Sequence, residues 1–236
     1  MEKHNYIYHF WPIYLLAAIL FCAATWSTAK AATAFAENVP VTRKHTIVID
    51  AGHGGEDGGA TSCTGVLESQ INLEIALRLD DLFHLLGYKT IMIRTTDISV
   101  YTYGNTLSEK KLSDLKQRVK VINQTPDAIL ISIHQNTFSD HRYSGAQVFY
   151  AATETSKELA ASMQMAFVKT CNPGSKRKEK SADGIYLMQH ITRPGILVEC
   201  GFISNPGEEV NLRAKEYQNK LCSVMATTLG NYLANR

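Results

Sequence analysis

Residues 46–60 read TIVIDAGHGGEDGGA, and this stretch sets the class of the fold. The run at 46–50 is apolar and rich in β-branched residues, which predicts a short buried strand. The glycines that follow allow the backbone to turn sharply and to approach a ligand closely. His53 lies among them, at the C-terminal end of the expected strand, where α/β sheets bind their ligands. The stretch therefore predicts both a central strand and a functional site.

The rest of the chain alternates strands and helices in the same way. Further strands are expected at residues 89–94, 128–134, 147–151 and 195–199. Helices are expected at residues 67–86, 114–123, 155–170 and 214–233. This order predicts a single α/β domain, with a central, mostly parallel or mixed sheet and helices on both faces.

The composition is that of a globular protein. The chain has 236 residues, of which 45% are hydrophobic and 19% are charged, and its formal net charge is +2. These values exclude a disordered chain, a collagen-like chain and a membrane protein with many spans. Because the charges are balanced, we expect no nucleic-acid partner.

The N-terminal segment is unlike the rest. Residues 7–26 (IYHFWPIYLLAAILFCAATW) form an apolar run, and small-x-small sequences follow at 29–31 and 34–36. Residues 1–36 are therefore expected to be either a cleaved signal peptide or a membrane anchor, since the run approaches the ~20 residues that a spanning helix needs. In both cases the segment contacts the membrane. The catalytic domain, residues 37–236, is then exported to the outer side of the cytoplasmic membrane, secreted or anchored.

Four polar residues lie where packing would favour apolar ones. His53 follows the first strand, Glu68 lies on the inward face of the first helix, and His134 and Glu199 end the strands AILISIH and GILVE. Each has a simpler interpretation alone, such as a structural histidine or a helix-start glutamate that interacts with the helix dipole. Two histidines and one carboxylate with open coordination are typical of a catalytic zinc site. A second carboxylate would then activate water for hydrolysis.

The sequence resembles the zinc-dependent N-acetylmuramoyl-L-alanine amidases, the type-3 amidase family, over nearly all of residues 45–235. The matching stretches are TIVIDAGHGGEDGGA (46–60), ESQINLEIALRL (68–79), IRTTD (93–97), LKQRVKVINQTPDAILISIHQN (115–136) and GILVECGFISNPGEE (195–209). The short single-domain build and the wording SIHQN at 132–136 are most similar to the spore-cortex, CwlD-like amidases of endospore-forming bacteria.

The resemblance implies a role for each of the four residues. The zinc ligands of the family fall on His53, Glu68 and His134, and its catalytic glutamate falls on Glu199. The implied reaction is the Zn2+-assisted hydrolysis of the amide bond between the lactyl group of N-acetylmuramic acid and L-Ala of the peptidoglycan stem peptide. In a spore-cortex enzyme this step leads toward muramic δ-lactam. A zinc peptidoglycan carboxypeptidase or deacetylase, and a non-catalytic wall-binding protein, are the alternatives.

Other polar residues carry weaker expectations. Arg94 is a candidate for substrate binding, although a structural pair with Asp97 explains it as well. Asn136 follows the second site histidine closely and is also a candidate for substrate binding. Arg118 and Asn123 are expected to connect a helix to the sheet.

Two further features bear on the envelope setting. Cys63, Cys171 and Cys222 are candidates for a disulfide in an exported protein, whereas Cys200 is expected in the core. Residues 172–180 (NPGSKRKEK) are either a solvated loop or a basic lip that faces an anionic polymer. The stretch between His134 and residue 155 holds no helix that could cover the site. Localisation and timing are therefore expected to come from the N-terminal segment, from expression, or from an activating or localising envelope protein as a partner.

Overall fold

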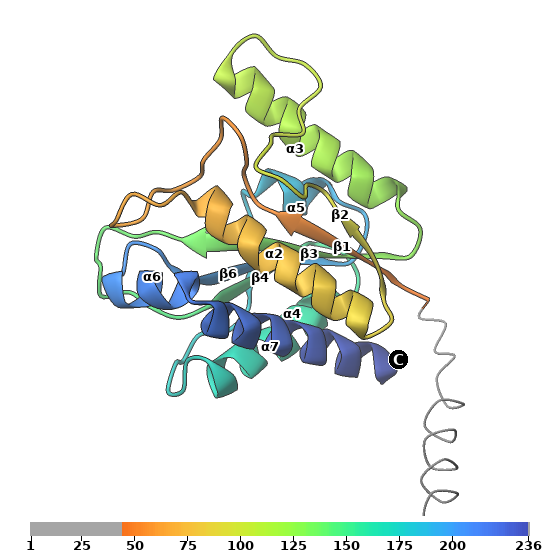
Figure 1. Cartoon of the computed structure of the whole chain (residues 1–236). Helices are drawn as coiled ribbons and strands as arrows, with labels where there is room; N and C mark the ends of the chain where they lie inside the picture. Colours follow the sequence, from red (N-terminus) through yellow and green to blue (C-terminus); the bar gives the residue numbers. More distant parts are fainter. Residues whose placement is uncertain (1–43, 236) are drawn as a thin grey trace, which may run out of the picture. The chain divides into compact units, whose positions relative to one another are not determined.

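The computed structural model describes residues 44–235, which are built around a six-stranded sheet of order β2-β1-β3-β6-β4-β5 (Figure 1). The strands are β1 (Thr46–Ala51), β2 (Lys89–Met92), β3 (Ala128–Asn136), β4 (Gln147–Tyr150), β5 (Lys180–Ser181) and β6 (Gly195–Phe202). The first four in the order are parallel to one another, whereas β4 runs antiparallel to β6 and β5 runs parallel to β4. The expected mostly parallel, mixed sheet is confirmed.

Helices cover both faces of this sheet, as expected for an α/β domain (Figure 1). One face carries α2 (Glu68–Leu85), α4 (Ser156–Thr170) and α7 (Lys215–Ala234). The opposite face carries α3 (Leu107–Gln124) and α5 (Tyr186–His190), and α6 (Pro206–Arg213) follows β6.

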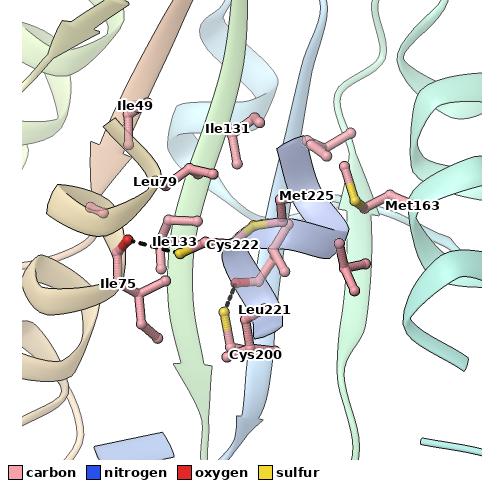
Figure 2. Packing of buried hydrophobic residues seen from close by; sticks show 14 of the residues in the cluster. Ile49, Ile75, Leu79, Ile131, Ile133, Met163, Cys200, Leu221, Cys222 and Met225 are labelled. Atoms are coloured by element: carbon pink, nitrogen blue, oxygen red, sulfur yellow. Dashed lines mark hydrogen bonds between the residues drawn. The ribbon is translucent and has the colours of Figure 1, made fainter. Parts of the chain in front are cut away.

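The central strands bury side chains on both faces because successive residues point to opposite sides. Ile49, Ile131 and Ile133 pack toward α2 and α7, where Figure 2 shows them beside Ile75 and Leu79. Side chains that alternate with these along the strands point to the opposite face, toward α3 and α5. They include Val48, Leu130 and Leu197. The double layer fixes the strand register, and therefore fixes where each strand ends.

Three short elements and one helix start differ from the sequence expectations. Strand β5 and helices α5 and α6 were not expected, because two to eight residues are too few to show a periodic pattern. Helix α3 begins at Leu107 and not at residue 114. Its first two turns are mostly polar, and a capping box between Thr106 and Glu109 starts it.

The four cysteines of the described residues are free thiols. The disulfide considered for Cys63, Cys171 and Cys222 is therefore not formed among them. Cys200 is fully buried, which confirms its expected place in the core. Cys222 is also buried, and its thiol donates to the carbonyl of Ile75 at 3.4 Å (Figure 2).

The expected signal peptide or anchor, residues 1–36, lies outside the described residues, as does the domain boundary at residue 37. Within residues 44–235, no helix has both the length and the apolar character that a membrane span requires.

Candidate metal centre and active site

The four residues singled out from the sequence converge at one edge of the sheet. His53 follows β1, His134 and Glu199 lie near the C-terminal ends of β3 and β6, and Glu68 is the first residue of α2. His134 and Glu199 are direct partners in the β3–β6 register. Ligand sites lie at this edge in open α/β sheets because the C-terminal ends of parallel strands meet there.

His53, Glu68 and His134 form a compact set of possible metal ligands. One donor atom from each residue lies within 4.8 Å of the other two. His53 Nε2 lies 3.3 Å from Glu68 Oε2, and His134 Nδ1 lies 3.0 Å from Glu68 Oε1. The two imidazole rings are 5.0 Å apart at an angle of 76°. Two imidazoles and one carboxylate are the donor set of catalytic zinc centres.

Two glycines keep the space for these side chains. A Cβ atom at Gly52 would lie 2.2 Å from Nε2 of His134. A Cβ atom at Gly59 would lie 2.6 Å from Oε2 of Glu68 and 2.7 Å from the ring of His53. Any larger residue at either position would displace a ligand, so the glycine-rich loop is shaped around the centre.

Glu68 is held by a set of hydrogen bonds. Its Oε2 accepts from the backbone N–H of Ala60 at 3.0 Å, and its Oε1 accepts from the backbone N–H of Gln135 at 3.1 Å. Asn72, one turn further along α2, donates to Oε1 at 3.2 Å. Burial acts to raise the pKa of Glu68, but the two site histidines outweigh it and hold the pKa far below its usual range. The carboxyl is therefore ionised, as a metal ligand must be.

His53 is fixed by its backbone and by a second carboxylate. Its φ is 62°, a left-handed conformation, and its carbonyl accepts a hydrogen bond from Arg118 at 2.8 Å. Nδ1 of the ring lies 3.0 Å from Oδ2 of Asp57. Burial acts to lower the pKa of His53, but Asp57 and Glu68 raise it to about 9. A carboxylate on Nδ1 leaves Nε2 to face the centre, which is the usual outer-shell arrangement for a metal-binding histidine.

Glu199 has a different environment. Its Oε2 is buried and has no hydrogen-bond partner among the described residues. Burial raises the pKa of Glu199 to about 7, because His134 and His53 only partly offset the loss of solvation. A carboxyl group with a pKa near neutrality can both accept and donate a proton, which is the property of a general acid–base catalyst.

The weaker sequence candidates have different outcomes. Arg94 is only 2% exposed and donates to the carbonyls of Ala51, Gly52, Ser69 and Thr96. It therefore supports the backbone under the site, and its candidate role in substrate binding stays a prediction.

The alternative pair of Arg94 with Asp97 is not among the ion pairs of the described residues. Asp97 instead accepts from the backbone N–H of Gly55 at 3.0 Å. Asn136 is half-buried at the end of β3, and its role in substrate binding stays a prediction.

Arg118 connects its helix to the sheet as expected, whereas Asn123 connects the helix to α5 and the loop after it, and not to the sheet. Arg118 is 2% exposed and forms ion pairs with Asp50 of β1 and Asp114 of its own helix. Asn123 donates to the carbonyl of His190 at 3.1 Å and accepts from the backbone N–H of Thr192 at 2.8 Å.

Three residues that support the site were not found from the sequence. Asp57 orients His53 through Nδ1 of its ring. Asn72 and Gln135 form a buried relay, in which Gln135 Nε2 donates to Asn72 Oδ1 at 3.1 Å and Asn72 donates to Glu68. The i, i+4 spacing of Glu68 and Asn72 on one helix is the signal from which this pair could have been predicted.

The basic segment at 172–180 packs partly against the sheet. The guanidinium of Arg177 lies 5.2 Å from the ring centroid of Phe202, and the carbonyl of Lys178 accepts from Gln147 at 2.7 Å. Gln147 is the antiparallel partner of Glu199. The segment thus lies near the end of the sheet that carries the site residues, and its role as a basic lip stays a prediction.

Fold and site together are typical of a hydrolytic enzyme of the α/β class, with a His-Glu-His set of possible metal ligands beside a buried carboxyl group. The comparisons with known proteins give the family. Residues 47–231 match the family model Amidase_3, described as N-acetylmuramoyl-L-alanine amidase. The chain belongs to this family of amidases.

Two relatives that are similar to this chain over most of its length support the assignment. The germination-specific N-acetylmuramoyl-L-alanine amidase of Bacillus subtilis (strain 168) is 38% identical over 191 residues, which are 80% of this chain and 80% of that protein. The CwlD amidase of Clostridioides difficile, solved in complex with the GerS lipoprotein, is 35% identical with a TM-score of 0.78. That match covers 81% of this chain and 100% of the other.

A third structure is more distant. The N-acetylmuramoyl-L-alanine amidase of Clostridium difficile 630 is 28% identical, with a TM-score of 0.71, over 83% of this chain and 100% of that chain. The α/β fold expected from the sequence is thus the fold of solved amidases.

Proposed function

We propose that this protein is a zinc-dependent peptidoglycan amidase that cleaves the bond between the N-acetylmuramic acid lactyl group and L-Ala of the stem peptide. The observation that carries the proposal is the cluster of His53, Glu68 and His134, with the unpartnered carboxyl of Glu199 directly across the β3–β6 register. A structural metal site closes its coordination with a fourth protein ligand, whereas three ligands leave a position for chemistry.

The residues of the chain divide the chemistry between them. A zinc ion held by the three ligands would supply Lewis acidity to the amide carbonyl. Glu199 takes a proton from the attacking water and returns it to the leaving nitrogen of L-Ala. Its Oε2 is buried and makes no hydrogen bond to the described protein, so no protein donor holds the carboxyl in its ionised form. The bonds from Ala60, Gln135 and Asn72 hold Glu68 still while this proton moves.

The biological setting follows from the relatives and from the N-terminal segment. The relatives support a role in spore-cortex processing toward germination. The apolar run at 7–26 supports export, with the catalytic domain on the outer side of the cytoplasmic or forespore membrane. The complex of the C. difficile CwlD amidase with a lipoprotein supports an envelope lipoprotein partner here too. Such a partner would increase activity if it stabilised the metal-loaded form.

Product analysis tests the proposal. The full chain, purified in detergent, is incubated with cell walls with and without a metal chelator, and the products are identified by mass spectrometry. An amidase releases stem peptides with a free L-Ala amino terminus, and we expect release only without chelator. Glu199→Gln should abolish release, whereas Glu216→Gln, an exposed carboxylate on α7, should leave it unchanged.

Other products would contradict the proposal. Free D-Ala would indicate a carboxypeptidase, and acetate would indicate a deacetylase. If the zinc-loaded chain releases nothing, even with an envelope extract that supplies a partner, the protein is a non-catalytic wall binder.

A further inference from the structure

An open hollow of about 530 Å³ lies between segments that are close in sequence to the site residues. Its walls come from residues 61–63, residues 137–139, His141 and Ser204. The first segment leads into Glu68 at the start of α2, the second follows β3 just beyond His134, and Ser204 follows β6. Because its walls continue directly from the segments that carry the site, a long substrate bound at the metal centre would extend into this hollow.

One half-exposed aromatic ring, Phe138, lines the hollow, and a second, Tyr143, packs against it. Phe138 is 49% exposed and Tyr143 is 47% exposed, and their ring centroids lie 4.6 Å apart. Tyr143 in turn lies 6.1 Å from the buried ring of Phe202. Large aromatic side chains usually bury most of their surface, so a ring pair left in water beside a catalytic centre suggests a surface for a ligand.

The ring pair is held in place before any ligand binds. The backbone N–H of Phe138 donates to Ser204 Oγ at 3.0 Å, and Asn205 donates to the carbonyl of Tyr143 at 3.2 Å. Both partners belong to the turn that follows β6. The rings therefore keep their position relative to Glu199, and binding would cost little further loss of conformational freedom.

The lining of the hollow is mostly uncharged. Among its lining residues, as described by the structure, there is one histidine, His141, and no Asp, Glu, Lys or Arg. Thr61, Thr137 and Ser139 present exposed side chains that carry hydroxyl groups. Charged residues line a separate pocket on the other side of His53, where Lys110 and Lys111 pair with Glu56 and Asp57.

We propose that the hollow is a subsite for the glycan strand of the substrate, in which Phe138 and Tyr143 stack on the apolar face of a hexosamine ring. A pyranose ring is uncharged, has apolar C–H faces and has many hydroxyl groups, and it matches aromatic rings flanked by hydroxyls. The stem peptide carries carboxylates and an amine, for which this lining offers no Asp, Glu, Lys or Arg and only His141 as a titratable group. The inference rests on the proposed function and names the part of the substrate that the surface recognises.

Binding of peptide-free glycan tests the subsite without hydrolysis. The full chain with Glu199→Gln is titrated with glycan oligomers stripped of stem peptides, and zinc content is measured for each variant. We expect Phe138→Ala or Tyr143→Ala to weaken binding by about tenfold, the loss of one stacked ring. Tyr103→Ala removes an exposed ring outside the hollow and should bind as the parent does.

A kinetic comparison gives the second readout. For the active chain, Phe138→Ala should lower kcat/KM at least about fivefold more on a multi-disaccharide substrate than on a single muramoyl-peptide. An equal loss on both substrates, or glycan binding that ignores both rings, would overturn the inference. The inference would also be overturned if the two substitutions weakened binding of free stem peptide and left the binding of glycan unchanged. These outcomes are distinct from failure of the proposed function, because the binding arm needs no amide cleavage.

Discussion

Replacing Asn72 with alanine should weaken zinc binding without removing any metal ligand. The Asn72 side chain is fully buried and donates both to Glu68 Oε1 at 3.2 Å and to the carbonyl of Gly52 at 3.1 Å. It also accepts from Gln135 Nε2 at 3.1 Å. The alanine variant leaves the Gln135 amide without its partner and frees Glu68 to rotate, whereas the Gly52 carbonyl keeps its hydrogen bond from Arg94.

The size of the effect follows from these contacts. Loss of an outer-shell partner lowers metal affinity by about 10- to 100-fold, which corresponds to about 1.4–2.7 kcal/mol of binding free energy. The one unpartnered buried amide should also destabilise the metal-free protein by about 1–3 kcal/mol. Glu68 keeps its bonds from two backbone N–H groups, so we expect weakened binding and not complete loss.

The assay is competition with a chromophoric zinc chelator, together with thermal unfolding of the metal-free protein. Gln218→Ala is the matched control, because Gln218 is a fully buried amide with three hydrogen-bonding partners outside the metal site. The control should lose stability and keep its zinc affinity. If Asn72→Ala binds zinc like the wild type, or if Gln218→Ala loses zinc equally, the relay does not orient Glu68.

Three more changes are informative. Gly52→Ala places a Cβ atom 2.2 Å from His134 Nε2, so zinc content measured after purification should fall to a small fraction, and full occupancy would contradict the tight fit. Glu199→Gln should lower kcat by about 10²- to 10⁴-fold yet raise the unfolding free energy of the metal-free protein at pH 8 by up to about 3 kcal/mol. Burial raises the pKa of Glu199 to about 7, so its carboxyl destabilises the fold progressively as the pH rises above the pKa of this group in the unfolded chain. Equal melting temperatures of the wild type and the variant at pH 8 would refute this. Burial acts to raise the pKa of Glu209, but hydrogen-bond donors at Cys63, Thr64 and Ser62 lower it to about 2. The ionised Glu209 therefore stabilises the fold above its unfolded pKa of about 4.3, and this stabilisation is lost as the pH falls. Glu209→Gln should therefore flatten the loss of stability between about pH 4.3 and 2, and an unchanged acid-unfolding curve would argue against it.

The sequence predicted the strands and the four site residues well because both follow from local patterns. Apolar runs of fixed period place β1, β3 and β6, and the polar residue at each C-terminal end then falls at one edge of a parallel sheet. What the sequence could not show are partners that meet only in three dimensions. Asp57 and Arg118 reach His53 from a loop and from α3, and no period in the chain relates them. The burial of Arg94 could not be predicted for the same reason, because the carbonyls to which it donates belong to separate segments of the chain.

The short elements were missed for a different reason. A helix of five or eight residues has too few turns to show an apolar stripe, and α6 is defined mainly by the Asn205 cap and Pro206. These short elements nevertheless matter to the site. Glu209 of α6 accepts hydrogen bonds from Ser62 and Cys63, and so connects the loop before Glu68 to α6.

The contrast between Glu68 and Glu199 shows how one fold separates two carboxylates by role. Glu68 receives three hydrogen bonds and two imidazoles, which stabilise its ionised form. Glu199 lies opposite His134 in the register, yet its Oε2 receives no hydrogen bond, so burial dominates its pKa. A backbone N–H aimed at Glu199 would stabilise the fold but would also fix the carboxyl as a permanent anion. The destabilising burial of Glu199 is therefore what leaves it able to accept a proton and to release it, which a metal ligand must never do.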